Sequence, residues 1–184
     1  MSLHSFVEEC EDFLRSWGKG AFALSSRYGA ESISPSLSPT GKYVSLSPFH
    51  VRLDGGDSAE GEASVVIDVS IVWQESYRVP ELWFTASTES GEFPPLESIQ
   101  GFISRNYRGA YCGDGTIAPS KDCTCMEGDL LTSCEWHPIT KVPSFCVHSC
   151  GTSKALSELA SLKPSLLGWL SSNLPLIGAS AHVC

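Results

Sequence analysis

Apolar residues at the start of the chain recur at steps of three and four and predict an amphipathic helix that ends at Gly18. Its apolar stripe should pack into a core and comprises Leu3, Phe6, Val7, Cys10, Phe13, Leu14 and Trp17. The opposite face should be solvated and acidic, with Glu8, Glu9, Glu11 and Asp12. Either Ser2 or a capping box of Ser5 and Glu8 could begin the helix.

The middle of the chain predicts three antiparallel strands. Apolar and polar residues alternate at 64–73 and again at 81–87. A further strand at 42–53 should be bent or interrupted by Pro48. Residues 25–42 are rich in serine, proline and glycine and predict a loop.

The second half predicts helix, an insertion, a short strand and more helix. Apolar residues at 96–103 have helical spacing. Residues 107–134 contain several glycines and cysteines with little periodicity, and we interpret them as an irregular Cys-rich insertion. A strand around Phe145 and Val147 precedes a cysteine, and helical spacing then continues with a break at Pro164.

The composition and the order of elements predict one α+β domain over residues 1–184. The chain is 42% hydrophobic and 18% charged, which is an ordinary globular composition. We expect a central antiparallel sheet with helices packed on one face.

The charge and the terminal sequence limit the partners. The net charge of -9 argues against nucleic acid and against an anionic membrane surface. Neither a secretory signal nor an apolar run of the ~20 residues that cross a membrane is found. We therefore expect a cytoplasmic monomer whose eight cysteines are reduced, with a secreted disulfide protein as the alternative.

Cys150 is the first candidate for chemistry because it stands where a strand gives way to a loop, so a large partner could reach it. In an extended strand it would share a face with Cys146 and His148. A helix beginning near Thr152 would favour a thiolate there through its positive end. His148 could act as a local base or simply bond a loop carbonyl, and the cysteine could be structural.

A zinc site in the Cys-rich insertion is the competing hypothesis. Its soft ligands would be Cys112, Cys123, Cys125, Cys134 and His137. Only Cys134 and His137 have the spacing usual for structural zinc, so we expect no metal. No glycine-rich phosphate loop is found either, and we expect no cofactor. A non-catalytic protein-interaction module with a zinc-binding insertion remains the alternative.

Three motifs, in this order and spacing, carry a family resemblance. Residues 76–84, Ser-Tyr-Arg-Val-Pro-Glu-Leu-Trp-Phe, are similar to an S-Y-x-V-P-x-L-Y-F strand, and residues 135–152 are similar to an H-P-x(4)-P-x(3)-L-H-P-C-x-T block. Residues 169–176 are similar to a C-terminal W-L-S and apolar-proline tail. The chain thus resembles the autophagy E2-like conjugating enzymes, more closely the branch of autophagy-related protein ten than that of autophagy-related protein three.

The resemblance implies an E2-like fold and a ubiquitin-like protein transferase that acts in autophagosome formation. Cys150 would receive autophagy-related protein twelve as a thioester from the E1-like autophagy-related protein seven. A lysine of autophagy-related protein five would then attack that thioester. Tyr77 matches the tyrosine of the family strand, so it would either help the lysine step or be an ordinary sheet residue. His148 would give local support, and either Thr132 or Ser133 could supply a polar partner. Ubiquitin E2 enzymes use an asparagine after His-Pro, but this chain has Ile139 there.

Overall fold

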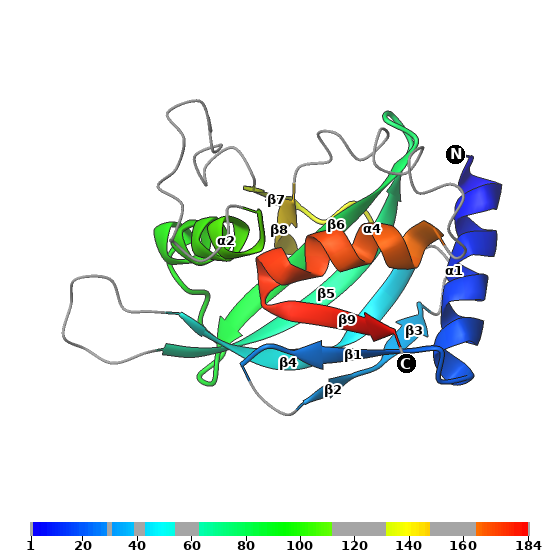
Figure 1. Cartoon of the computed structure of the whole chain (residues 1–184). Coiled ribbons are helices and arrows are strands. Elements are labelled where there is room, and N and C mark those ends of the chain that lie inside the picture. The colour runs from blue at the N-terminus through cyan, green and yellow to red at the C-terminus, as the bar shows by residue number, and fades with distance from the viewer. Residues whose placement is uncertain are drawn as a thin grey trace, which may run out of the picture.

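The computed structural model describes residues 2–28, 31–38, 43–53, 63–111, 132–147 and 165–183. These residues form an α+β structure with two antiparallel sheets (Figure 1). The larger sheet has the order β3-β4-β5-β6-β8-β7, with strands at Pro35–Leu37, Tyr43–Leu53, Ala63–Gln74, Val79–Thr88, Pro143–Val147 and Thr132–Trp136. The smaller sheet has the order β2-β1-β9, with strands at Ser32–Ile33, Phe22–Ser26 and Ala179–Val183.

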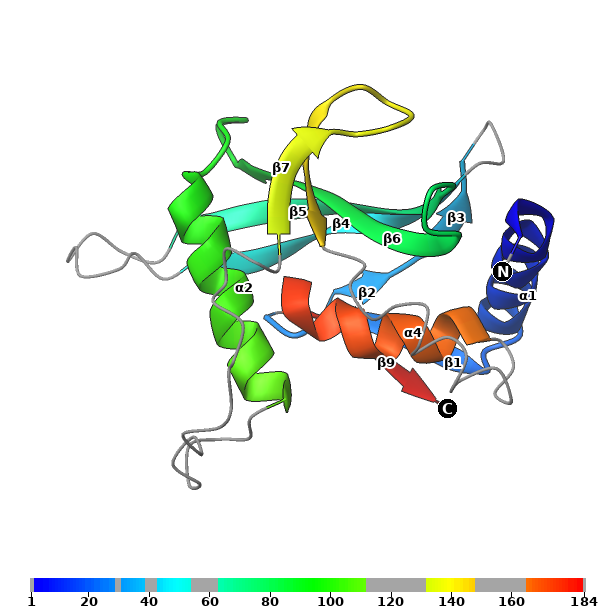
Figure 2. The same cartoon turned by 90° about the horizontal axis from the view of Figure 1, so that it is seen from above.

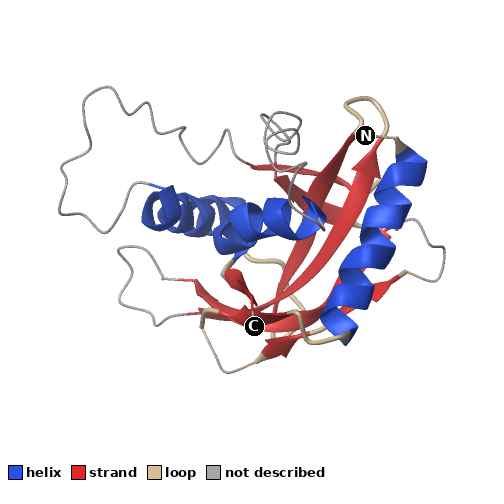
Figure 3. Ribbon diagram, turned by 45° about the vertical axis from the view of Figure 1, so that its right-hand side comes forward, coloured by secondary structure: helices blue, strands red, loops and turns tan. Residues whose placement is uncertain are grey.

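The helices cover one face of the larger sheet. They are α1 (Leu3–Gly18), α2 (Leu96–Tyr111), α4 (Ser165–Asn173) and the short 3-10 helix η3 (Leu174–Ile177). Seen from above, α2 and α4 lie on the same side of the sheet (Figure 2), and Figure 3 shows α1 along its edge. The predicted fold class is confirmed. No described helix combines the length and apolar content that a membrane crossing requires.

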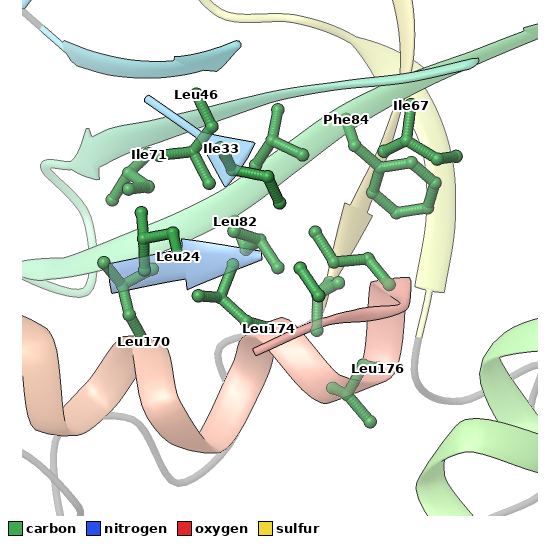
Figure 4. Close-up of a cluster of buried hydrophobic side chains, with 14 of the residues drawn as sticks. Leu24, Ile33, Leu46, Ile67, Ile71, Leu82, Phe84, Leu170, Leu174 and Leu176 are labelled. Carbon is green, nitrogen blue, oxygen red and sulfur yellow. The ribbon is translucent and has the colours of Figure 1, made fainter. Parts of the chain in front are cut away.

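The core fills the space between the sheet and the helices. Strand β5 contributes Ile67 and Ile71, β6 contributes Leu82 and Phe84, and α4 contributes Leu170, all 1% exposed or less. Figure 4 shows these side chains converging with those of the small sheet and η3. The predicted alternation of β5 is confirmed, since its inward residues are all buried: Val65, Ile67, Val69, Ile71 and Trp73.

Strand β4 confirms the expected effect of Pro48. Its pairing with β5 shifts register between Leu46 and Phe49, which is a bulge around the proline. Proline has no backbone N–H to donate, so it is accommodated where the regular ladder is interrupted.

Helix α1 begins as one of the two predicted alternatives. The side chain of Ser2 accepts a hydrogen bond from the N–H of Ser5 at 3.1 Å and caps the helix. Phe6, Cys10 and Phe13 are buried as expected. The prediction for Glu9 is wrong: it is 5% exposed and accepts a hydrogen bond from the N–H of Leu166 at 3.3 Å. A partner from a distant helix therefore compensates the burial of this carboxylate.

The small sheet was not expected. Residues 25–42 were predicted as a loop, but they include the end of β1 and all of β2 and β3. Strand β9 pairs with β1 over its full length, from Phe22 opposite Val183 to Ser26 opposite Ala179. These strands are short, and β1 takes one of its partners, β9, from the far end of the described residues, so local periodicity gives little signal.

The predicted insertion is shorter at both ends. Residues 107–111 belong to α2, and 132–134 belong to β7. Residues 112–131 lie outside the described part of the chain.

Candidate functional site

Two of the four predicted site residues lie in the described structure. Tyr77 and Thr132 are described, whereas His148 and Cys150 lie outside the described residues. Strand β8 ends at Val147, three residues before Cys150. The end of β8 is therefore the described part of the chain that leads into Cys150.

Pairing fixes the direction in which β8 ends. Val147 is opposite Leu82 of β6 on one side and opposite Thr132 of β7 on the other. Because β8 runs antiparallel to β6, it points toward the start of β6, which is the β5–β6 turn that carries Tyr77. The register thus brings Thr132 next to the last residue of β8 and directs the strand toward the Tyr77 turn.

Tyr77 is open to solvent at a tight turn. Its side chain is 70% exposed. The following residue, Arg78, has a left-handed φ of 55°, and its N–H bonds the carbonyl of Gln74 at 2.8 Å. The turn therefore presents the phenol outward, where another protein can meet it.

Thr132 carries an unused polar group. The residue is 2% exposed, and its Oγ1 has no hydrogen-bond partner among the described residues. A buried hydroxyl without a partner costs free energy, so such an atom calls for an explanation. It is available to a group that is not part of the described structure.

Cys146 is not suited to act as the nucleophile. It is 6% exposed on the face of β8 opposite the main core, beside Val72 and Trp83. Burial, and then the charges of Glu81 and Glu135, raise the pKa of its thiol far above the ordinary value. The thiol is therefore protonated at neutral pH, and the thiolate is the reactive form.

Two other described cysteines are free as well. Cys10 is buried in the core, where burial and the neighbouring Glu9 and Glu11 raise its pKa to about 12. Cys134 is exposed on β7. The three described cysteines form no disulfide with one another, and the other five lie outside the described residues, so the reduced state stays a prediction.

His137 has a structural role that excludes it as a free metal ligand. Its Nδ1 accepts hydrogen bonds from the N–H groups of Ile139 and Thr140 at 3.2 and 3.0 Å. Its Nε2 therefore carries the proton and donates to the hydroxyl of Ser70 at 2.8 Å. With both nitrogens engaged, the ring holds the β7–β8 turn against the open face of the sheet, meaning the face opposite the helices.

The zinc hypothesis finds no support in the described residues. There, no three His, Cys, Asp or Glu side chains gather as a metal site requires. Of the five ligands considered, Cys112, Cys123 and Cys125 lie outside the described residues. Both nitrogens of His137 are hydrogen-bonded, so this residue is not available as the second ligand that zinc binding at the exposed Cys134 would need.

Sequence analysis missed a pocket on the open face. It has a volume of about 240 Å³ and lies between strands β4, β5, β6 and β8 and the β7–β8 turn. Its polar lining includes Tyr43, Asp68, Ser70 and His137. Asp68 was a possible signal, since it is the charged residue of a strand whose other residues are apolar or neutral polar.

The family model described as "Autophagocytosis associated protein, active-site domain" matches residues 5–182. A comparison with curated proteins finds no match. The family match spans nearly the whole chain and includes the end of β8, the Tyr77 turn and Thr132.

Proposed function

The chain belongs to the autophagy E2-like conjugating enzymes, and from this premise we propose that Cys150 carries a ubiquitin-like modifier as a thioester and passes it to a lysine of a target protein. The family implies, in general, an E1-like enzyme and a ubiquitin-like protein as partners. The observation that carries the proposal is the family match across the region that leads into Cys150.

The reaction consists of two acyl transfers. The Cys150 thiolate attacks the modifier's C-terminal carbonyl in the E1 thioester; a new C–S bond forms, and the E1 thiolate leaves. A neutral lysine amine of the target then attacks the Cys150 thioester. An isopeptide bond forms, the Cys150 thiolate leaves, and a base removes the extra proton of the amine.

The geometry of β8 supports roles for Tyr77 and Thr132 in this reaction. Val79, at the start of β6, lies three residues before Leu82, which is roughly 10 Å along a strand. Three residues of chain after Val147 span at most about 11 Å, so the thiol of Cys150 is within reach of the Tyr77 turn. We assign Tyr77 to the lysine step, where its phenol can accept or relay a proton.

Thr132 is the candidate donor to the developing oxyanion. Its hydroxyl is buried and unpaired within the described structure, and it lies opposite the last residue of β8. A preorganised donor without a competing partner suits that task. It would replace the asparagine of ubiquitin E2 enzymes, for which this chain has Ile139. His148, two residues before Cys150, is assigned local support of the thiol.

The motifs at 76–84 and 135–152 favour the branch of autophagy-related protein ten. The modifier would then be autophagy-related protein twelve, the E1-like enzyme autophagy-related protein seven, and the target autophagy-related protein five. We place this reaction in the cytoplasm during autophagosome formation, within one E2-like domain over residues 1–184 that acts as a monomer without a cofactor.

Non-reducing gels test the proposal. The chain is incubated with the E1-like enzyme, the modifier and ATP, and we expect an adduct that thiols remove. Cys150→Ser should convert it into a thiol-resistant oxyester, and Cys150→Ala should abolish it. Cys134→Ala, which removes an exposed thiol, is the matched control and should load normally. An adduct that persists in Cys150→Ala would exclude Cys150 from the reaction.

A further inference from the structure

The pocket on the open face of the larger sheet is lined by none of the residues to which the transfer reaction was assigned above. It is lined by Ser144 near the start of β8, whereas Cys150 follows the other end of that strand. The pocket is therefore a separate feature of the surface, and its chemistry can be considered independently.

The lining combines one carboxylate with a ring of hydroxyls. Asp68 is the acidic residue of the pocket, and the hydroxyls come from Tyr43, Ser45, Ser70, Thr85, Thr140 and Ser144. No lysine or arginine is among the lining residues. A set of hydroxyl and carboxylate oxygens accepts hydrogen bonds and favours a positively charged donor.

Among the described residues, no charge compensates that of Asp68. This residue makes no hydrogen bond or ion pair with any described residue. Although its side chain is exposed at the mouth of the pocket, the surrounding sheet and turn exclude enough water to raise the pKa of its carboxyl. Lys141, in the adjacent turn, forms no ion pair with it in the described structure. A carboxylate in this setting gains most from a cation supplied from outside.

The pocket is preformed. The His137 ring is hydrogen-bonded to Ser70 at 2.8 Å and to the N–H groups of Ile139 and Thr140. It therefore fixes the β7–β8 turn, which forms one side of the pocket, against strand β5 of the sheet. The Tyr43 and Trp83 rings also pack against His137 in T-shaped arrangements, with ring centroids 5.9 and 5.4 Å from that of His137. A preformed site requires little ordering when a ligand binds.

We propose that this pocket receives the cationic side chain of a lysine or arginine that a protein partner presents. The volume of about 240 Å³ suits the end of one such side chain rather than a folded surface. An ammonium or guanidinium group would donate to Asp68 and to the neighbouring hydroxyls. The net charge of -9 favours approach of a basic partner toward the chain.

NMR titration of the full chain tests the site itself. The probes are Nα-acetyl-lysine methylamide and Nα-acetyl-arginine methylamide, and Nα-acetyl-norleucine methylamide is the neutral analogue. We expect saturable amide shifts at the pocket residues with the cationic probes. Asp68→Asn should weaken that binding at least about tenfold. Glu97→Gln, which removes the same charge from an exposed position on α2, should leave it unchanged.

Equal shifts with the norleucine analogue, or unchanged affinity in Asp68→Asn, would overturn the proposal. Ser45→Leu provides a second variant, since it keeps Asp68 but fills the pocket, and it should also abolish the shifts.

Partner binding tests whether a protein supplies the cation. The affinities of the E1-like enzyme and of the ubiquitin-like modifier for the chain are measured separately, with native Asp68 and with Asp68→Asn. We expect one of the two to bind at least about fivefold more weakly to the variant and with less dependence on salt. Unchanged affinity for both would reject protein docking at this pocket. Neither measurement involves the thioester, so failure here is distinguishable from failure of Cys150 chemistry.

Discussion

The two faces of the larger sheet differ in chemistry, although the same strands build both. On the helix-covered face, Ile67 and Ile71 of β5 are fully buried in the main core. On the open face, the neighbouring positions of that strand include Asp68 and Ser70, which line a polar pocket. The buried apolar residues of the described part of this face form a small cluster of Val72, Trp83 and Cys146, with Tyr43 and Ile139 packed against it.

Along each strand, residues that pack the core therefore alternate with residues that are available for recognition. Successive side chains point to opposite faces, so a change at one position affects packing, and a change at the next affects recognition. The covered face should therefore control stability, and the open face should tolerate change except where the His137 turn is attached to it. Four variants test that separation, in order of their expected effect on stability.

The largest effect is expected from Ile67→Ala. This side chain is fully buried, and its removal leaves a cavity in the core, so the free energy of unfolding should fall by about 2–5 kcal/mol. Val66→Ala, its half-buried neighbour on the open face, should cost about 1 kcal/mol or less. Urea unfolding measures both. Equal losses would show that the open face is packed as tightly as the covered one.

His137→Ala should be the exception on the open face. It removes the acceptor for two backbone N–H groups and the bond to Ser70, and we expect a loss of about 2–3 kcal/mol at neutral pH. Urea unfolding at pH 7.5 measures it.

The same residue predicts a pH dependence. Burial, and secondarily the charge of Lys141, lower the pKa of His137 below 6.5, so folding favours the neutral ring. Its stabilisation should be complete above pH about 6.5 and should be lost as the pH falls through the lower folded-state pKa. The stability difference between the native chain and His137→Ala should thus shrink in acid, and a constant difference would contradict this account.

Thr132→Val should change stability by less than about 1 kcal/mol, and in either direction. The substitution removes a buried hydroxyl that has no described partner and keeps the shape of the side chain. If Thr132 donates to the oxyanion, transfer of the modifier to lysine should slow at least about tenfold. Thr132→Ser, which keeps the hydroxyl, is the control. A normal transfer rate in Thr132→Val would remove this residue from the proposed mechanism.

Tyr77→Phe should leave stability unchanged within about 0.5 kcal/mol, because the phenol is exposed at a turn. Loading of the thioester should be normal, while its discharge to lysine should slow at least about tenfold. Single-turnover discharge assays separate the two steps. Trp136→Phe alters an equally exposed ring, 69% accessible at the other end of β8, and should discharge normally.

Sequence periodicity predicted the elements whose own residues determine their burial. Strand β5 and helix α1 each carry a continuous apolar pattern, and both formed where expected. The 76–84 motif drew attention to Tyr77, and the strand register places Thr132 beside the last residue of β8, which points toward the Tyr77 turn; their roles in the reaction stay predictions.

Local patterns could not predict features that depend on distant partners. Glu9 is acceptable in the interior only because the N–H of Leu166 meets it. His137 was weighed as a ligand, but its bond to Ser70 of β5 gives it a structural role. The pocket around Asp68 arises only when four strands and a turn come together, and no single segment contains that information.

The pairing of β1 with β9 has a consequence for how the molecule is made. Ser25 and Ser180 lie side by side although they are 155 positions apart. During synthesis, which proceeds from the N-terminus, β1 can pair with β2 early but has to wait for β9 on its other edge. Completion of the small sheet is thus a late step in folding, and such a long-range closure is intrinsically slow.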